Sequence, residues 1–485
     1  AVLTLAVTLL AIDSTVLALA IPSLSADLSP TASQLLWIGD IYSFTLAGLL
    51  VTMGNVADRI GRRRLLLIGT LGFGTASIMA AFAPSAGALI AARALLGVGG
   101  ATIMPSTLSL IRNIFPDARH RTTAIAIWSA GSSGGTALGP LIGGALLERF
   151  WWGSVFLINV PVMAVVIIAG LRLLPESRNE RGGPVDLVSA MLSVLAIVPI
   201  VYAVKSFAHN GLAVVAVAAL LAGLGAGWLF LRRQRTLTTP LIDIELFKRP
   251  AFTWAIVATV LAIFALAGLL YFFSQYLQLV RGCSTLQAGL TELPASLASI
   301  AVVAVVAAAV HRLGNGRALG GGLILAAAGL LVVAVGESHG GIVVICIGLL
   351  VIGTGIGLAF TVSTGAVLGS VPVDRAGAAS AISETGLELG VALGIAVLGT
   401  IQDVGYRLLL GRPPADLPNR VVDAAEQSLA TLAGIVDRID PAQARTAFTH
   451  AMQATAVIAA VILVVSGVMA VRHVPTTSGT SEETS

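Results

Sequence analysis

The chain has 485 residues, of which 56% are hydrophobic and only 11% charged, and its mean hydropathy is +0.95. These values lie well outside the range of soluble globular proteins and indicate an integral membrane protein. A net charge of only +4, with no clustered basic surface in any polar segment, argues against a nucleic-acid partner. Two cysteines far apart, Cys283 and Cys346, do not suggest a disulfide framework or a metal site.

A membrane-crossing helix needs about 20 apolar residues. The sequence predicts fourteen such spans, so we expect an all-α membrane protein. The chain opens inside an apolar run without Met, and we expect a short cytoplasmic tail before residue 1. The predicted spans are 2–24, 35–56, 65–83, 87–111, 122–147, 153–174, 186–206, 211–231, 251–278, 285–310, 318–336, 341–370, 376–402 and 446–471.

The positive charges are unevenly divided between the two faces of this arrangement. Most of the 28 Lys and Arg residues fall in alternate loops and at the C-terminal end. The short loops on the other face hold only Arg149, Lys205 and Arg281. Because cytoplasmic loops carry the excess of Lys and Arg, we expect both termini to be cytoplasmic. The longest polar pieces, 232–250 inside and 403–445 outside, are too short for soluble domains.

The outer segment 403–445 contains apolar residues at helical spacing. Asp440 followed by Pro441 has the form of a helix start, with proline at the first helical position. We expect a short amphipathic helix or helical hairpin on the outer face, followed by a long last helix. The small polar tail at 476–485 is expected to be disordered.

Charge gathers at GNVADRIGRRR, residues 54–64, between the second and third predicted spans. Its arginines hold the loop in the cytoplasm, where anionic lipid attracts them. A topology signal needs no acid, however, so Asp58 points to a second role. We expect Asp58 to pair with Arg62, or with a basic residue after the fourth span such as Arg112, and so to tie cytoplasmic helix ends together. The alternative is that the arginines are only a topology signal.

This loop resembles the GxLADRxGRR motif of the major facilitator superfamily, with Val56 in place of the usual Leu. The matching residues are Gly54, Ala57, Asp58, Arg59, Gly61 and Arg62 to Arg64. GTALGPLIGG resembles the antiporter motif of the superfamily, through Gly135, Gly139, Pro140, Gly143 and Gly144. ARALLGVGG resembles its fourth-helix motif, through Arg93, Gly97 and Gly99, and IDSTVLALAIP at 12–22 resembles the first-helix signature of the fourteen-helix drug:proton antiporters. PLIDIELFKRPAF, LQAGLTELP and GAASAISETGLELG extend the resemblance over essentially the whole chain.

The resemblance implies two six-helix bundles, at 1–174 and 251–475, with two inserted helices and a cytoplasmic linker at 175–250. It also implies alternating access around a site near the membrane midplane. The expected activity is proton-coupled export of lipophilic cationic and amphiphilic compounds, such as ethidium, acriflavine, quaternary ammonium compounds and fluoroquinolones. The proton gradient is then the expected energy source, and no cofactor is expected. The expected partners are small-molecule drugs, protons and membrane lipids, with the chain acting as a monomer.

Carboxylates inside spans are costly and therefore functional by default. Asp13 lies near the middle of the first span, and we expect it to carry the transported proton. Arg93, the base that we expect to be buried within a span, is its expected partner. Alternatively, the two residues form a static pair that holds spans one and four together.

Four further carboxylates lie within spans. Asp40 and Glu292, one in each bundle, are expected to face each other across the cavity, either as contacts for a cationic drug or as a second proton site. For Asp40, the alternative is a helix-end residue that faces outside water. Glu384 and Glu388 share a helix face; we expect Glu388 to line the cavity as a proton or drug site, and Glu384 to be hydrated.

Aromatic faces attract flat cationic ligands. The candidates for such contacts are Tyr42, Phe44, Trp128 and Phe272. An interfacial aromatic belt is the competing explanation for several neighbouring aromatic residues. The glycines and proline of the antiporter motif predict close helix packing and a hinge.

Two other functions compete with drug export. One is proton-coupled export of a lipid or an endogenous metabolite. The other is a membrane-embedded enzyme or receptor, which is disfavoured because the six histidines lie mostly in loops.

Overall fold

The computed structural model describes residues 1–115, 117–176, 186–210, 214–237, 244–338, 341–370, 376–410 and 441–474. Every regular element in these ranges is helical, which confirms the predicted all-α membrane protein. Within these ranges, ten helices are long and apolar enough to cross a membrane, and one bent pair makes an eleventh candidate. The predicted total of fourteen spans stays a prediction.

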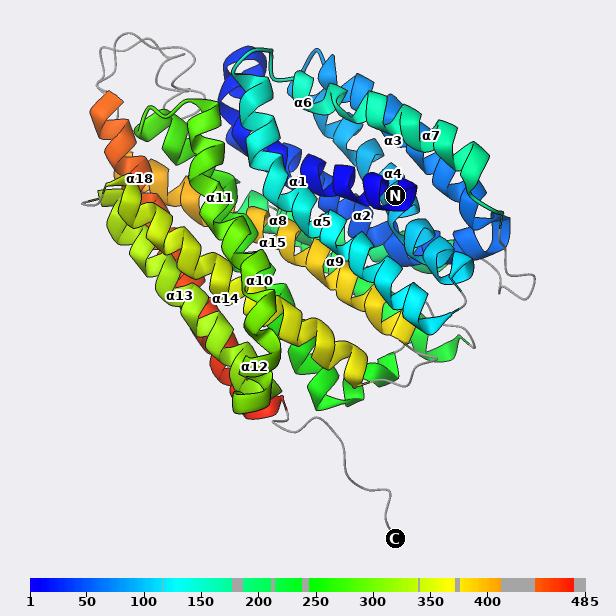
Figure 1. Ribbon diagram of the computed structural model, residues 1–485. Helices are drawn as coiled ribbons and strands as arrows, with labels where there is room; N and C mark the ends of the chain where they lie inside the picture. The colour runs from blue at the N-terminus through cyan, green and yellow to red at the C-terminus, as the bar shows by residue number, and fades with distance from the viewer. Residues whose placement is uncertain are drawn as a thin grey trace.

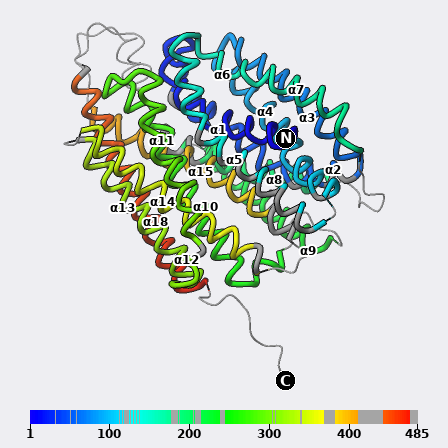
Figure 2. The backbone as a smooth tube through the Cα atoms, in the orientation of Figure 1, coloured from blue at the N-terminus to red at the C-terminus, as the bar shows by residue number. Residues whose placement is uncertain are grey.

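The helices form an N-terminal group, a C-terminal group and an inserted pair (Figures 1 and 2). The N-terminal bundle consists of α1 (Val2–Leu28), α2 (Ala32–Ile60), α3 (Arg62–Ala81), α4 (Ala86–Ile114), α5 (Ala118–Leu147), α6 (Ser154–Leu157) and α7 (Asn159–Leu173). The inserted elements are α8 (Leu187–Asn210), α9 (Val214–Thr236) and η1 (Ile244–Lys248). The C-terminal bundle consists of α10 (Pro250–Gln275), the π-helical η2 (Tyr276–Val280), α11 (Thr285–Ala301), α12 (Val303–Leu313), α13 (Asn315–Ser338), α14 (Ile342–Gly369), α15 (Ala376–Leu410) and α18 (Pro441–His473).

The last two helices are longer than the sequence predicts. α15 continues to Leu410, where an ion pair between Asp403 and Arg407, one turn apart and 3.3 Å long, supports the added turns. α18 begins at the predicted Pro441, and the side chain of Gln443 donates to the Leu410 carbonyl at 3.1 Å. The predicted amphipathic helix of the outer segment and the predicted disordered tail lie outside the described residues.

α5 packs closely along α1 because glycines recur at every fourth residue of α5. A Cβ added at Gly135 would lie 2.4 Å from the carbonyl oxygen of Thr8, and one at Gly139 would lie 1.9 Å from Thr15 Oγ1. Small residues at this spacing allow helix backbones to approach each other in a membrane. This is the close packing expected for the antiporter motif, and its role as a hinge stays a prediction.

The C-terminal bundle repeats the arrangement where α15 packs along α10. A Cβ at Gly390 would lie 2.8 Å from the carbonyl oxygen of Val260, and one at Gly394 would lie 2.2 Å from that of Phe264. The same four-residue spacing therefore sets one close helix pair in each bundle.

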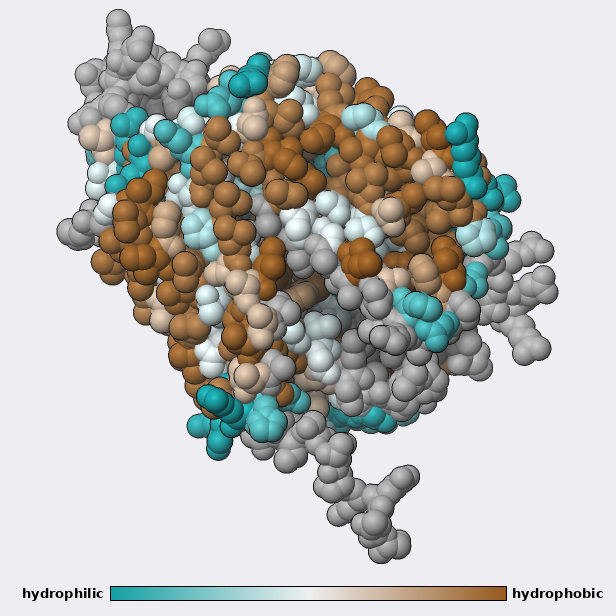
Figure 3. Space-filling view, viewed as in Figure 1, coloured by the Kyte–Doolittle hydropathy of each residue, from teal (hydrophilic) through white to brown (hydrophobic). Residues whose placement is uncertain are grey.

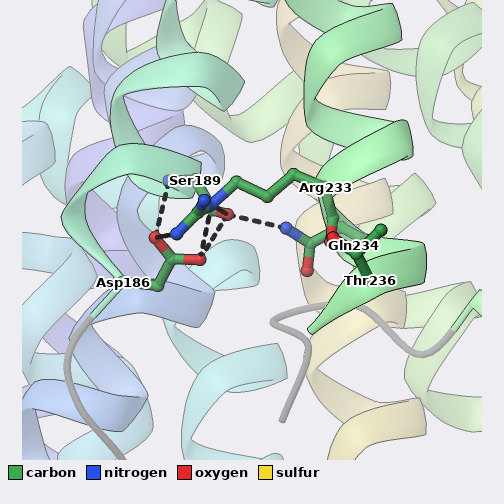
Figure 4. A network of polar contacts seen from close by, with 5 residues as sticks. All are labelled: Asp186, Ser189, Arg233, Gln234 and Thr236. Atoms are coloured by element: carbon green, nitrogen blue, oxygen red, sulfur yellow. Dashed lines mark hydrogen bonds and ion pairs between the residues drawn. The ribbon is translucent and has the colours of Figure 1, made fainter. Parts of the chain in front are cut away.

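The inserted helix α8 packs against α2 and α15, one helix from each bundle, and α9 packs on α8. The start of α8 and the end of α9 are joined by a polar network (Figure 4). In it, Arg233 donates to both carboxylate oxygens of Asp186, at 3.2 and 3.0 Å, and Gln234 donates to Ser189 Oγ at 2.8 Å. Partial burial acts to raise the pKa of Asp186, but the hydrogen bonds from Arg233 and Ser189 outweigh it and hold this pKa below its usual range. The network joins α8 and α9 into one unit. Through α8, this unit packs where the two bundles meet.

The contacts that join the two bundles gather at the end of the molecule where α1 meets α2, which we call the α1–α2 end. Here Gln278 of η2 donates to the Leu19 carbonyl at 3.1 Å, and Tyr271 donates to the Leu35 carbonyl at 2.6 Å. Thr285 of α11 also donates to the carbonyl of Gly144 in α5, at 3.2 Å. On the face drawn in Figure 3, apolar side chains cover most of the surface, and a hollow lies near its middle.

Candidate transport site

A charged pair is buried inside the N-terminal bundle. Asp13 of α1 and Arg93 of α4 are each only 1% exposed. Asp13 Oδ2 lies 3.8 Å from Arg93 Nη1, and Asp13 Oδ1 accepts a hydrogen bond of 2.7 Å from Asn159 of α7. The structure therefore brings together the two residues that the sequence predicted as partners, together with a third that it did not predict.

Arg93 is also held by α2. Its Nη2 lies 3.4 Å from the Gly39 carbonyl oxygen, and its guanidinium carbon lies 5.3 Å from the centroid of the Tyr42 ring. This contact needs close helix packing, which Gly97 allows, because a Cβ there would lie 2.6 Å from the Tyr42 carbonyl oxygen. Two buried opposite charges attract each other strongly, although desolvation opposes their pairing. Protonation of Asp13 would remove this attraction while leaving the contacts of Arg93 with α2.

Sequence reasoning missed Asn159. Its side-chain amide donates both to Asp13 and to Ser77 Oγ of α3, the second at 3.1 Å, and it is fully buried. The available signal was one amide side chain at the start of an otherwise apolar helix, NVPVMAVVIIAGLRL. Asn159 connects the acid of α1 to α3 and α7.

Asn159→Leu is expected to impair transport without preventing insertion. A hydrogen bond to a charged group contributes about 1.5–3 kcal/mol, so we expect transport to slow by roughly tenfold or more. Initial efflux rates at matched expression measure this. Ser77→Ala serves as the control, because it leaves the hydrogen bond between Asn159 and Asp13 in place; an equal loss in both variants would contradict a direct role for that bond.

Asp40 lies where the bundles meet. It is fully buried, which excludes the alternative that it faces outside water. Asp40 lies within electrostatic range of Tyr271 of α10 and of Arg93. Gly39 permits this meeting, because a Cβ there would lie 2.7 Å from the Tyr271 ring.

Glu388 of α15 reaches the same region from the C-terminal bundle. It is half-buried, lies close to the Ser43 side chain of α2, and is within electrostatic range of Tyr42. Glu384, also half-buried, lies close enough to repel Glu388. Tyr42 therefore lies between the acid of α1 and the acid of α15.

Glu292 is on the other side of the C-terminal bundle. It is 8% exposed, and its Oε1 has no hydrogen-bond partner among the described residues. Its helix, α11, packs against α5 and α14, whereas Asp40 lies near α4 and α10. The predicted pairing of Asp40 and Glu292 across a cavity stays a prediction.

The other predicted aromatic contacts lie in packing positions. Phe44 packs with Val201 of α8 and with two alanines of α15. The indole of Trp128 donates to Thr107 Oγ1 at 3.1 Å within the N-terminal bundle. Phe272 packs 5.1 Å from the Tyr271 ring, measured between centroids. Of the four candidates, Tyr42 is the one that the structure places beside the buried charges, and the drug-binding role of all four stays a prediction.

The charged loop is built around Gly61. This residue has φ 111°, a conformation that favours glycine, and a Cβ there would lie 2.6 Å from Glu176 Oε1. Glu176 accepts hydrogen bonds from the backbone N–H groups of Arg63 and Arg64, each 3.2 Å long, and so caps α3 with a negative charge. The sequence analysis did not predict this role for Glu176.

The structure describes only some of the other residues predicted to act in or near the charged loop. A Cβ at Gly54 would lie 3.8 Å from Pro105, an ordinary packing distance against α4. The side chains of Asp58 and Arg112 lie outside the described part of the chain, so the expected pairing of Asp58 stays a prediction.

Comparison with known proteins places this arrangement in a family. Residues 3–395 match the sequence model of the Major Facilitator Superfamily. The chain belongs to this superfamily and is a multi-pass membrane transporter, not an enzyme. The multidrug efflux pump LfrA of Mycolicibacterium smegmatis is 47% identical over 470 residues, which cover 96% of this chain and 93% of the relative.

A second relative is the methyl viologen resistance protein SmvA of Salmonella typhimurium. It is 37% identical over 446 residues, which cover 92% of this chain and 90% of the relative. Among solved structures, a bacterial homolog of the human lysosomal transporter Spinster, in an inward-facing and unoccupied conformation, aligns with a TM-score of 0.69. That alignment covers 98% of this chain and 95% of the other at 17% identity, and supports the fold.

Proposed function

We propose that this chain exports lipophilic cations and amphiphilic drugs in exchange for protons, across the bacterial cytoplasmic membrane. The observation that carries the proposal is the buried cluster of Asp13, Arg93 and Asn159. A carboxylate in the middle of a membrane helix is suited to take up and release a proton. The efflux and resistance names of LfrA and SmvA support drugs as the cargo.

In this proposal, the protonation of Asp13 is coupled to the contacts between the two bundles through Arg93 and α2. When Asp13 is ionised, it attracts Arg93, which also contacts Gly39 and Tyr42 of α2. When Asp13 binds a proton, the attraction is lost and α2 is free to shift relative to α1. Because α2 packs against α15, where Ser43 lies close to Glu388, a shift of α2 reaches the other bundle.

The orientation follows from the charge bias. With both termini cytoplasmic, the α1–α2 end is external, and the bundle contacts there close the external face. This supports an inward-facing state, from which alternating access would carry cargo outward. The cationic drugs expected as cargo include ethidium, acriflavine and quaternary ammonium compounds.

Purified protein in liposomes tests the proposal. Addition of ethidium should release protons from the wild-type protein, and an imposed proton gradient should drive ethidium transport. Ethidium transport that ignores the gradient would refute the proton coupling. Gradient-driven movement of a lipid, without any of ethidium, would favour export of a lipid or metabolite instead.

Glu292→Gln is expected to separate drugs by charge. An unpaired carboxylate attracts cations strongly in a low-dielectric cavity. One acid and aromatic stacking are therefore enough to bind a monovalent cation, whereas a cation with a second fixed charge needs a second acid. A loss of about 1.4 kcal/mol would lower affinity for a divalent cation about tenfold. Resistance to methyl viologen and to ethidium measures the difference, with Glu384→Gln as the control. Equal losses for both drugs would assign Glu292 to the proton pathway or to the structure.

A further inference from the structure

Another buried acid lies outside the site described above. Glu337 is near the end of α13, at the α1–α2 end of the molecule, and is 5% exposed. Neither of its carboxylate oxygens has a hydrogen-bond partner among the described residues. A carboxylate in this position carries a large desolvation cost while it is charged. Burial without a hydrogen-bond partner therefore favours the neutral, protonated form of Glu337 over the charged one.

The basic neighbour of Glu337 is engaged with other groups. Arg281 donates to the Gly336 carbonyl at 2.6 Å and to the Tyr276 hydroxyl at 2.7 Å. That hydroxyl in turn donates to the backbone carbonyl of Glu337 at 2.8 Å. Arg281 therefore bonds to the main chain beside Glu337 and also lies within electrostatic range of the Glu337 carboxyl group.

Among the described residues, the remaining surroundings of Glu337 offer few ionisable groups. η2 and the turn after it contribute Tyr276, Arg281 and Cys283. From α18, the neutral Gln453 donates to the Ala334 carbonyl at 2.9 Å, and from α14 the apolar Ile345 packs against Gly336. In the part of the chain that the structure describes, Arg281 is the charged group within electrostatic range of Glu337 and so able to pair with it once it is ionised.

The element that carries Tyr276, and leads directly into Arg281, also touches the N-terminal bundle. η2 is a π-helical turn, a form that is frequent at functional sites. Its Gln278 donates to the Leu19 carbonyl of α1 at 3.1 Å. If the bundles separate at this end, η2 loses that contact, and the position of Arg281 relative to α13 is free to change.

We propose that Glu337 and Arg281 form a proton-operated latch at the external end of the C-terminal bundle. While this end is closed, Glu337 holds a proton and Arg281 bonds to Gly336 and Tyr276. When the end opens, the O–H bond of Glu337 breaks, the proton passes to external water, and the carboxylate pairs with Arg281. An external proton then promotes closure, which is the direction that a proton antiporter needs for its return. The latch takes its orientation from the proposed function but does not require proton transfer at Asp13.

Spin labels across the external end test the latch. We would replace Cys283 and Cys346 by Ser, introduce Arg149→Cys on the N-terminal bundle and Leu290→Cys on α11, and measure the distance distribution without substrate. Asp13→Asn, added to this background, removes the proton site on which the proposed function rests. The ratio of closed to open forms should fall roughly tenfold between about pH 5 and about pH 8.

Glu337→Gln should abolish this response and keep the external end closed, and Glu337→Asp should retain a response. Arg281→Gln should also reduce it, because the ionised acid loses its partner. The controls are His339→Asn and His450→Asn, which remove the nearest histidines in the sequence and on α18 and should leave the response intact. A full response in Glu337→Gln, or its loss in a histidine variant, would overturn the latch. If the wild-type liposomes show no proton coupling but the labels respond through Glu337, the proposed function fails while the latch stands.

Discussion

Asp13→Asn is expected to abolish gradient-driven efflux of every substrate, while the protein still reaches the membrane. The amide has nearly the shape of the carboxyl group but cannot bind and release a proton. Arg93 keeps its contacts with Gly39 and Tyr42 in this variant, so the bundle is expected to remain assembled. Ethidium efflux from energised cells at matched expression measures the loss.

Asp27→Asn is the matched control, because it makes the same change on the same helix. Asp27 accepts a hydrogen bond of 2.7 Å from the indole of Trp152, and an amide oxygen is able to accept it equally. We therefore expect near-normal efflux from this variant. Normal efflux from Asp13→Asn itself would remove Asp13 from the mechanism.

Gly289→Val is expected to block transport of all substrates by keeping the bundles apart at the α1–α2 end. A Cβ at Gly289 of α11 would lie 2.2 Å from the carbonyl oxygen of Pro140 in α5, and a backbone atom has little room to yield. Overpacking of this kind costs about 1–3 kcal/mol, which shifts a two-state equilibrium roughly 5- to 150-fold. The cost falls on the closed arrangement of the two bundles and not on either bundle alone.

Transport rates for several drugs, together with the melting temperature of the purified protein, test this expectation. Gly134→Val is the control, because a Cβ at Gly134 of α5 meets no atom within 4 Å. The control is expected to transport normally. A defect in Gly289→Val that is confined to one drug would point to the binding site and contradict a role in closure.

The sequence by itself determined the membrane class, the helical architecture and which acids lie deep within the predicted spans. Hydropathy and burial cost are properties of a local stretch of chain, so they are visible without knowledge of the fold. Asp13 and Arg93 were predicted as partners because an acid and a base that are both deep within spans have few alternatives. Gly135 and Gly139 were predicted to pack closely because their spacing already defines a helix face.

The tertiary structure decided which groups meet. Asn159 reaches Asp13 across 146 positions of sequence, and no local pattern encodes that contact. No local pattern encodes the close approach of Glu176 to Gly61 either. Phe44, predicted as a drug contact, packs beside α8 because the direction of an aromatic side chain depends on how the whole helix is rotated against its neighbours. Spacing along the chain specifies a helix face, but only the packing of the bundles determines what that face contacts.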